Sequence, residues 1–367
     1  MKNLLKVQLL ICFLVNNLFA QSYSEQGLEK SDSLKSLEYP YILPIYGEAA
    51  YKLGYKLPYS AGIGINYIWQ ESDLIIDNLQ VGFNNGPMTN LDEIIRFNGA
   101  VAGASGVNVR PDIWLFPFLN VYGLFAQSKT STEISAGLYL PDTSNNYNEV
   151  TAFSTKANFD ATSLGFGLTP TFAVKGWWIA LDMNMLWTDV SALDKPVFTF
   201  VFGPRFGKTY KISEDMNLAF WFGGFRLKFS SETSGSLNVN ELFNTDDLQA
   251  KVDQGFIKVE EAQANTIAWW ESLSPIEQQN PLNQAKYETA NRTIQKTGDF
   301  LTKVDGALST AETSTVQYSL DKRNENMWNL VVGTQFQLNK HWMIRAEYGF
   351  LGSRSQFVGG LQYRFGL

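Results

Sequence analysis

The sequence predicts an all-β protein that closes into an antiparallel barrel, and three observations lead to that fold class. The chain has 367 residues with 14% aromatic side chains and 29 glycines, which favours strands over helices. Apolar and polar residues alternate through most of the chain from about residue 61, which is the period of a strand. No stretch of 18 apolar residues follows residue 20, so any membrane-spanning part must be a closed barrel.

The last two predicted strands show the alternation most clearly. Their apolar residues occupy alternate positions: Trp342, Ile344, Ala346, Tyr348 and Phe350 in one, and Phe357, Leu361, Tyr363, Phe365 and Leu367 in the other. A face so rich in rings is typical of a lipid-facing surface with aromatic girdles. A chain that ends on such a strand resembles bacterial outer-membrane β-barrel proteins. Residues 107–126 are also similar to a segment of uncharacterised outer-membrane proteins. The resemblance implies outer-membrane lipid as surroundings and the barrel assembly machinery as a partner during biogenesis.

The N-terminus predicts a secretory signal peptide over residues 1–20, with a charged start, an apolar run and a cleavage region that ends at Ala20. The only cysteine, Cys12, lies inside this segment, so the mature chain has no disulfide. Residues 21–58 are polar and then punctuated by prolines. They form a periplasmic segment, which is either a linker or a small plug made by residues 45–57.

The barrel is expected over residues 59–367, with about 10–12 strands. Ten strands follow from the alternation, and twelve if residues 45–58 pair or the long first strand splits near residues 70–73. With both termini in the periplasm, the short turns at 116–118, 175–176, 211–216 and 339–340 fall on the periplasmic side. Most gaps on the other side are longer. Trp114 and Tyr122 flank the first turn and are expected at the membrane interface.

A helical insertion interrupts the barrel over residues 232–325. Apolar residues spaced by three and four form stripes, Ser274-Pro275-Ile276-Glu277 is a capping box, and a further helix is expected from residue 281 to about 308. Because successive connections alternate between the two sides of the membrane, the insertion is expected to be extracellular. It is a hairpin whose stripes bury each other, a lid over the barrel mouth, or a surface for a partner, with Trp269 and Trp270 as the exposed candidates.

The residue content argues against catalysis, metal binding and nucleic-acid binding. The single histidine, His341, is placed at the periplasmic end, so a serine–histidine mechanism at the outer rim lacks its base. No cluster of histidine and cysteine could hold a metal, and no cofactor is expected. A net charge of −7 disfavours nucleic acid as a partner.

Charged residues on the predicted inner faces are the candidate site. The set comprises Arg110, Asp112, Asp182, Arg205, Arg226, Lys228, Arg345, Glu347 and Arg364. A charge on the lipid face costs about 2–4 kcal/mol at the bilayer midplane, so these residues are expected to point inward. In residues 218–230, Trp221, Phe225, Leu227 and Phe229 are accordingly expected to face lipid. The charges either cross-link a filled lumen or line a positively biased pathway.

The sequence thus favours a channel or transporter that passes a small polar or anionic solute past the extracellular insertion. The alternative is a barrel without transport activity that serves as a platform for adhesion or protein–protein interaction through its outer helices.

Overall fold

The computed structural model describes residues 38–142, 146–174, 176–191, 193–229, 232–242 and 244–367. The expected signal peptide and residues 21–37 lie outside the described residues. Within the described part of the chain, no helix combines the length and the apolarity that a membrane span requires.

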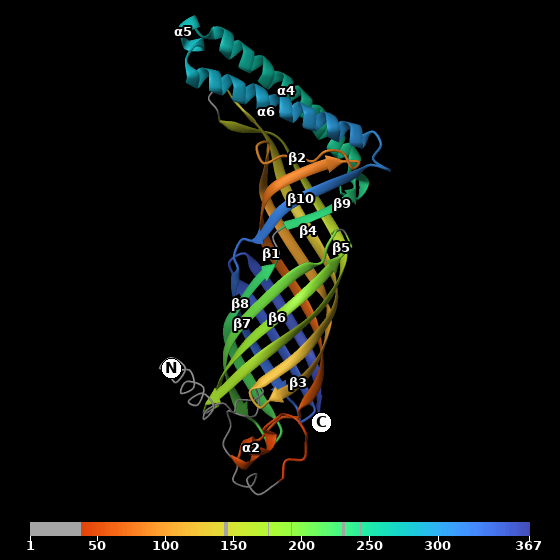
Figure 1. Cartoon of the computed structure of the whole chain (residues 1–367), viewed down its shortest axis with the longest axis vertical. Coiled ribbons are helices and arrows are strands. Elements are labelled where there is room, and N and C mark those ends of the chain that lie inside the picture. Colours follow the sequence, from red (N-terminus) through yellow and green to blue (C-terminus); the bar gives the residue numbers. More distant parts are fainter. Residues whose placement is uncertain (1–37, 143–145, 175, 192, 230–231, 243) are drawn as a thin grey trace, which may run out of the picture.

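Ten antiparallel strands close into a barrel (Figure 1). In order around the wall they are β1 (Ala61–Phe83), β3 (Ile95–Phe116), β4 (Leu119–Pro141), β5 (Tyr147–Val174), β6 (Trp177–Val190), β7 (Val197–Lys211), β8 (Asn217–Phe229), β11 (Trp328–Gln337), β12 (Trp342–Leu351) and β13 (Arg354–Phe365). The last strand returns to the first, with Phe365 opposite Ala61 and Arg354 opposite Ser72. The predicted fold class is confirmed, at ten strands for the closed barrel. The long first strand does not split.

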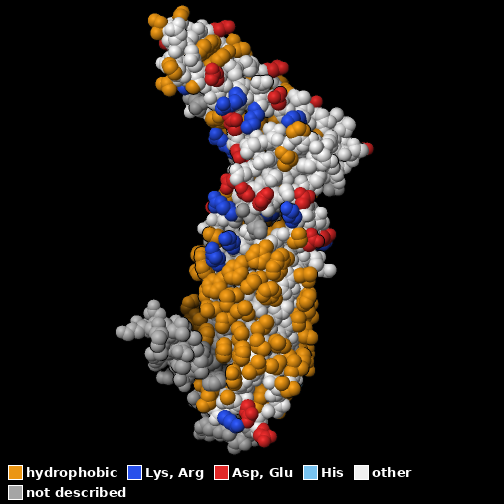
Figure 2. Space-filling model, viewed as in Figure 1, with side chains coloured by type: hydrophobic (Ala, Val, Ile, Leu, Met, Phe, Trp, Pro, Cys, Tyr) orange, Lys and Arg blue, Asp and Glu red, His pale blue; other side chains and the backbone are white. Residues whose placement is uncertain are grey.

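The outer face of the barrel is an apolar belt, because one face of every strand carries large apolar side chains (Figure 2). All ten strands contribute at least one that is more than a third exposed: Ile63, Ile65, Tyr67, Val107, Phe125, Leu164, Phe166, Trp177, Ile179, Trp187, Phe198, Phe206, Phe220, Phe222, Leu330, Val332, Ile344, Tyr348, Phe357 and Leu361. Charged side chains gather above and below this belt (Figure 2). The belt has the pattern of a lipid-facing surface.

One end of the barrel, the turn end, has only short connections. Two to five residues join the strands there, and the C-terminus lies at the same end (Figure 1). The segment 38–58, with the short helix α2 (Gly47–Lys52), lies across this end. The backbone N–H of Ile42 donates to the Leu367 carbonyl at 2.9 Å, and Lys56 Nζ lies 2.9 Å from Asp215 Oδ1 in the β7–β8 turn. The described part of this segment therefore covers the turn end from outside the lumen.

At the opposite end, the loop end, strands β1, β3, β4 and β5 continue past the barrel. Strand β1 pairs with β13 only as far as Ser72, and from Leu74 onward it pairs with β10 (Thr315–Asn324). Strand β10 pairs in turn with β9 (Glu232–Asn238), and β2 (Thr89–Asn90) lies beside β1. The upper wall is therefore a sheet ordered β5-β4-β3-β1-β10-β9. In contrast to the barrel, no ladder between described residues joins its edge strands β5 and β9.

Helices lie over the loop end. They are α3 (Val239–Leu242), α4 (Thr245–Ser272), α5 (Pro275–Gln278) and α6 (Pro281–Leu308). Helices α4 and α6 form an antiparallel hairpin with α5 at its tip (Figure 1). Asn244 caps α4 and Asn280 caps α6, and Ser274 forms the predicted capping box with Glu277. The expected helix over residues 281–308 is confirmed.

The apolar stripes of the hairpin pack in two directions. They meet each other, as expected, since Gly255 of α4 lies against Leu301 of α6. They also cover buried residues of the upper wall. This core joins Val252, Leu301, Val304, Ala307 and Leu308 of the helices to Leu79, Leu91, Ile94, Ile95 and Leu138 of the wall. The half of the hairpin that holds these residues is therefore a roof on the barrel wall, while the tip at α5 projects away from the barrel (Figure 1).

Candidate functional site

Arg205 is the centre of an ion-pair network inside the membrane-spanning part of the lumen. Its Nε lies 2.6 Å from Glu347 Oε2 and its Nη2 lies 2.7 Å from Glu347 Oε1, while its Nη1 donates to Asp182. Trp221 Nε1 donates to Glu347 Oε2 at 2.7 Å. The Trp221 ring lies so close to Gly333 that a Cβ added there would stand 2.3 Å away, so only glycine leaves room for it.

A second cluster lies nearer the turn end and is built on Asp112. Arg364 Nη1 lies 3.1 Å from Asp112 Oδ2, and Asn120 Nδ2 donates to the same oxygen at 2.7 Å. The guanidinium of Arg110 stacks over the Tyr122 ring at 3.6 Å from its centroid. Six of the predicted inward residues besides Arg205 therefore face the lumen: Arg110, Asp112, Asp182, Arg345, Glu347 and Arg364.

These two clusters fill the lumen at their level. Asp112, Asp182, Arg205, Glu347 and Arg364 are each only 3–6% exposed. A water-filled pore would leave its lining accessible to solvent. The arrangement of the described side chains is thus a cross-linked layer, in which three carboxylates balance most of the arginine charge.

Arg226 and Lys228 were predicted to face inward, and this was wrong. On β8 the side chain of Trp221 is buried in the lumen, and Leu227 and Phe229 share its face, since both line an internal cavity. Arg226 and Lys228 alternate with these residues and lie on the outer face. The prediction failed because the polarity of the wall reverses at the loop end. There the interior is apolar and the exterior is polar.

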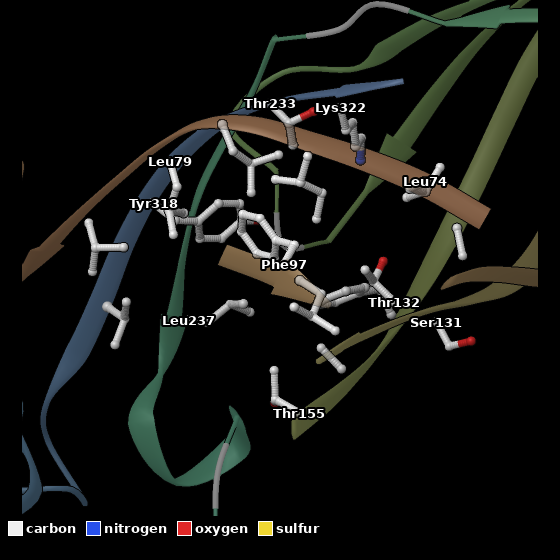
Figure 3. A pocket seen from close by; sticks show the side chains of 18 of the residues that line it. Leu74, Leu79, Phe97, Ser131, Thr132, Thr155, Thr233, Leu237, Tyr318 and Lys322 are labelled. Carbon is white, nitrogen blue, oxygen red and sulfur yellow. The ribbon is translucent and has the colours of Figure 1, made fainter. Parts of the chain in front are cut away.

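An apolar cavity of about 470 Å³ lies at the loop end, between the upper wall and the roof formed by α4 and α6 (Figure 3). Its volume falls in the range of about 300–1,000 Å³ that ligand pockets occupy. Figure 3 shows Leu79, Phe97, Leu237 and Tyr318 converging on its interior. Further apolar lining comes from Val81, Phe83, Leu91, Ile134, Leu138, Phe153, Leu248, Val252, Phe300, Leu301, Val304, Leu308, Val316 and Leu320.

The floor of the cavity is polar. Ser72 Oγ donates to Asn324 Oδ1 at 3.1 Å, and both residues line the cavity while being 2% and 5% exposed. They lie where β1 leaves β13 for β10, and Gln70, Ala104 and Thr130 continue the cavity lining from this level toward the lumen.

Two titratable groups of β10 line the cavity wall. Burial, assisted by the charge of Asp194, raises the pKa of Tyr318 to about 12. Burial also lowers the pKa of Lys322 from its ordinary value, and no charged group offsets it. Lys322 therefore places an amine in a mostly apolar part of the chamber.

Trp269 and Trp270 lie at the last turn of α4, next to the hairpin tip and away from the cavity. Trp270 stacks on Tyr287 of α6, with ring centroids 4.5 Å apart, and both tryptophans are half-buried. Their placement does not cover the barrel mouth. The residues that roof the cavity belong to the other half of the hairpin.

The sequence did not predict the cavity lining, although it predicted one part of it. The apolar stripe with Leu248 and Val252 was expected to pack against another helix, and its contact with the upper wall of the barrel was not foreseen. Trp114 and Tyr122 were expected at the interface and are instead buried inside, at 5% and 4% exposure. Tyr122 donates to Asn184 Oδ1 at 2.7 Å, so a polar lumen accommodates its hydroxyl.

The described residues contain no group of three histidine, cysteine or carboxylate side chains that could hold a metal ion. His341 lies at the turn end, where its ring stacks on Tyr363 and its Nδ1 lies 2.9 Å from the Arg364 carbonyl oxygen.

No protein-family model and no curated protein matches this sequence. Among solved structures, the chain is similar to the β domain of the Bordetella autotransporter BrkA, with a TM-score of 0.30 and 9% identity over 83% of this chain and 100% of that one. It is similar to the toluene transporter TbuX of Ralstonia pickettii, with a TM-score of 0.30 and 9% identity over 95% and 99% of the two chains. A FadL homologue of Pseudomonas aeruginosa gives a TM-score of 0.26 and 7% identity over 93% and 100%.

The class of the protein follows from its own geometry. Ten strands close without a free edge, every strand turns apolar side chains outward, and charged side chains gather above and below that belt on the face that Figure 2 shows. The protein is a bacterial outer-membrane β-barrel.

Proposed function

We propose that this protein captures a small, largely apolar solute at the cell surface as the first step of its passage through the outer membrane. The observation that carries the proposal is the cavity of about 470 Å³ beneath the helical roof. A concave, mostly apolar chamber with a few polar groups is the usual form of a small-molecule site.

The proposal places the loop end outside the cell. Outer-membrane barrels have short periplasmic turns and longer extracellular loops; in this barrel every connection at the turn end is short, while the long β1–β3 and β8–β11 connections both lie at the loop end. The helical insertion is then extracellular, and the segment 38–58 covers the periplasmic mouth.

The charged lumen acts in this proposal as a gate below the binding site. A solute that leaves the cavity toward the periplasm must displace the layer around Arg205. A lumen that selects a small polar or anionic solute by its own positive charge receives less support, because Asp112, Asp182 and Glu347 compensate the arginines. The cavity favours a solute with an apolar body.

We also propose that the protein works without catalysis and without a cofactor. The place of the single histidine supports this proposal, because His341 lies at the turn end, far from the described residues that line the cavity.

Equilibrium dialysis of naphthalene against the protein in lipid nanodiscs tests the proposed capture. Saturable binding at one site per chain is expected, above the background of empty nanodiscs. Leu237→Trp fills the cavity and should abolish that binding. Leu330→Trp, the same change on the lipid-facing surface, should not. Absence of a saturable component in the wild type would overturn the proposal.

The interaction platform remains the second candidate, and the hairpin tip is the observation that favours it. Ile276 and Leu282 are 83% and 75% exposed there. Ile276→Ser with Leu282→Ser should weaken attachment to a surface or partner while naphthalene binding stays unchanged. Removal of the whole hairpin would not separate the two functions, because it also removes the roof of the cavity.

A further inference from the structure

The inward row of β10 carries one residue that packing does not explain. Val316, Tyr318, Leu320, Lys322 and Asn324 occupy alternate positions, and all five line the cavity. The row is apolar except at its lower end, where Lys322 lies opposite Ile76 of β1. Figure 3 shows the Lys322 side chain reaching from β10 into the pocket.

The Lys322 ammonium group has no carboxylate partner among the described residues. The acids nearest to it along the strands are engaged on the outer face: Asp321 accepts a hydrogen bond from Asn78 Nδ2, and Asp77 lies 3.8 Å from Arg323 Nε. The other lysine of the cavity, Lys251 on α4, is paired with Asp247 at 2.7 Å. An ammonium group in largely apolar surroundings without a counter-charge is costly, and an anionic ligand would relieve that cost.

We infer that the cavity binds an amphipathic carboxylate, with the apolar chain among the side chains of β1, β9, α4 and α6 and the carboxylate on Lys322. This inference rests on the proposed capture of an apolar solute and names the chemical class of that solute. It also assigns Lys322 as the residue that recognises the head group. A charge-assisted hydrogen bond in a site of low dielectric gives such a contact both strength and specificity.

A flexible lysine can also line an apolar wall with its stem and hold its head in water. In that case the cavity would bind neutral and anionic amphiphiles equally well. The two arrangements differ in the measured preference between ligands of equal chain length.

The test compares decanoate, decanol and decylammonium by isothermal titration of the full chain in nanodiscs, with empty nanodiscs as the reference. Wild type should bind decanoate at least about tenfold more tightly than decanol, and decylammonium least. Lys322→Met keeps the length and apolar stem of the side chain, and should lose this preference while it still binds decanol. Lys322→Arg should retain the preference.

Lys251→Met is the matched control, because it removes the other cavity lysine, which already has a partner. It should leave the decanoate preference unchanged. Equal binding of decanoate and decanol by wild type and Lys322→Met would overturn the role of Lys322 and leave the proposed capture standing. If neither ligand bound above the nanodisc background, the proposed capture itself would fail.

Discussion

Arg205 and Glu347 are 142 positions apart in the sequence and meet across the lumen through two hydrogen bonds of 2.6 and 2.7 Å. Their strands, β7 and β12, are not neighbours, since β8 and β11 lie between them. The pair therefore spans the interior of the barrel, and together with Asp182 it fixes opposite sides of the wall to each other.

Arg205→Met should destabilise the barrel by about 3–5 kcal/mol, because it leaves two buried carboxylates without their partner. Arg354→Met is the matched control. Arg354 is 2% exposed, and its Nε and Nη1 have no hydrogen-bond partner in the described part of the chain, so its loss should be neutral or stabilising. Urea unfolding in lipid vesicles, followed by tryptophan fluorescence, measures both. Equal losses in the two variants would contradict the central role of Arg205.

Acidification should loosen the roof from the wall through Glu93. Burial raises the pKa of Glu93, but hydrogen bonds from Thr293, Lys296 and Arg292 of α6 outweigh it and hold the pKa below its ordinary value. A depressed pKa contributes stability above the unfolded value of about 4.3, and this contribution is lost as the pH falls through the folded pKa.

Hydrogen exchange of α6 measures this loss, which should appear below about pH 4 in the wild type. Glu93→Gln should show faster exchange already at neutral pH and little further change on acidification. Glu133→Gln, which removes an exposed pair with Lys156 on the wall, serves as the control and should leave α6 unchanged. A wild-type exchange rate that is flat across this range would count against the ion-pair attachment.

Planar-bilayer recordings should find the barrel closed, with or without its roof. The seal lies in the layer around Arg205 and Asp112 rather than in the hairpin, so deletion of residues 245–308 should not produce steady conductance. Arg205→Ala combined with Glu347→Ala removes the two side chains that fill the lumen centre and should produce it. Discrete channels after the hairpin deletion alone would place the seal in the helices.

Arg226→Glu together with Lys228→Glu should change the free energy of unfolding by no more than about 0.5 kcal/mol, because both side chains lie on the outer face near the loop end of β8. Arg205→Glu provides the contrast, since it puts a third acid beside two buried carboxylates. A loss from the double variant comparable to that from Arg205→Met would mean that these side chains point inward after all.

The sequence was sufficient for the barrel because lipid imposes one rule on every strand. Alternation fixed the faces of β12 and β13 residue by residue, and the capping box at Ser274 located the hairpin tip. The rule that apolar side chains face outward holds only at the level of the lipid. Beyond that level the inner face of β8 becomes apolar, and rings such as Phe225 no longer mark the side that faces the membrane.

The cavity could not be predicted for a related reason. Its walls come from segments that are far apart in the sequence, such as those of Leu79 and Val304. The apolar pattern of each segment alone is that of an ordinary packing face. Only the exchange of partners by β1, from β13 to β10, brings these faces around a common space. A lone lysine in an apolar row, Lys322, was the one local signal of a site, and a strand pattern alone does not say which side of the wall such a residue faces.

The upper wall has a consequence for how the cavity can change. In the membrane, widening the barrel would break a ladder of hydrogen bonds between paired strands. At the loop end, no ladder between described residues joins β5 and β9; α3 contacts both strands, and the β6–β7 loop meets β9 through the Leu193–Gly235 bridge and two hydrogen bonds between Asp194 and Ser234. Separating β5 from β9 breaks no ladder of hydrogen bonds in the described part of the chain. The circumference of the chamber can therefore change while that of the membrane barrel stays fixed.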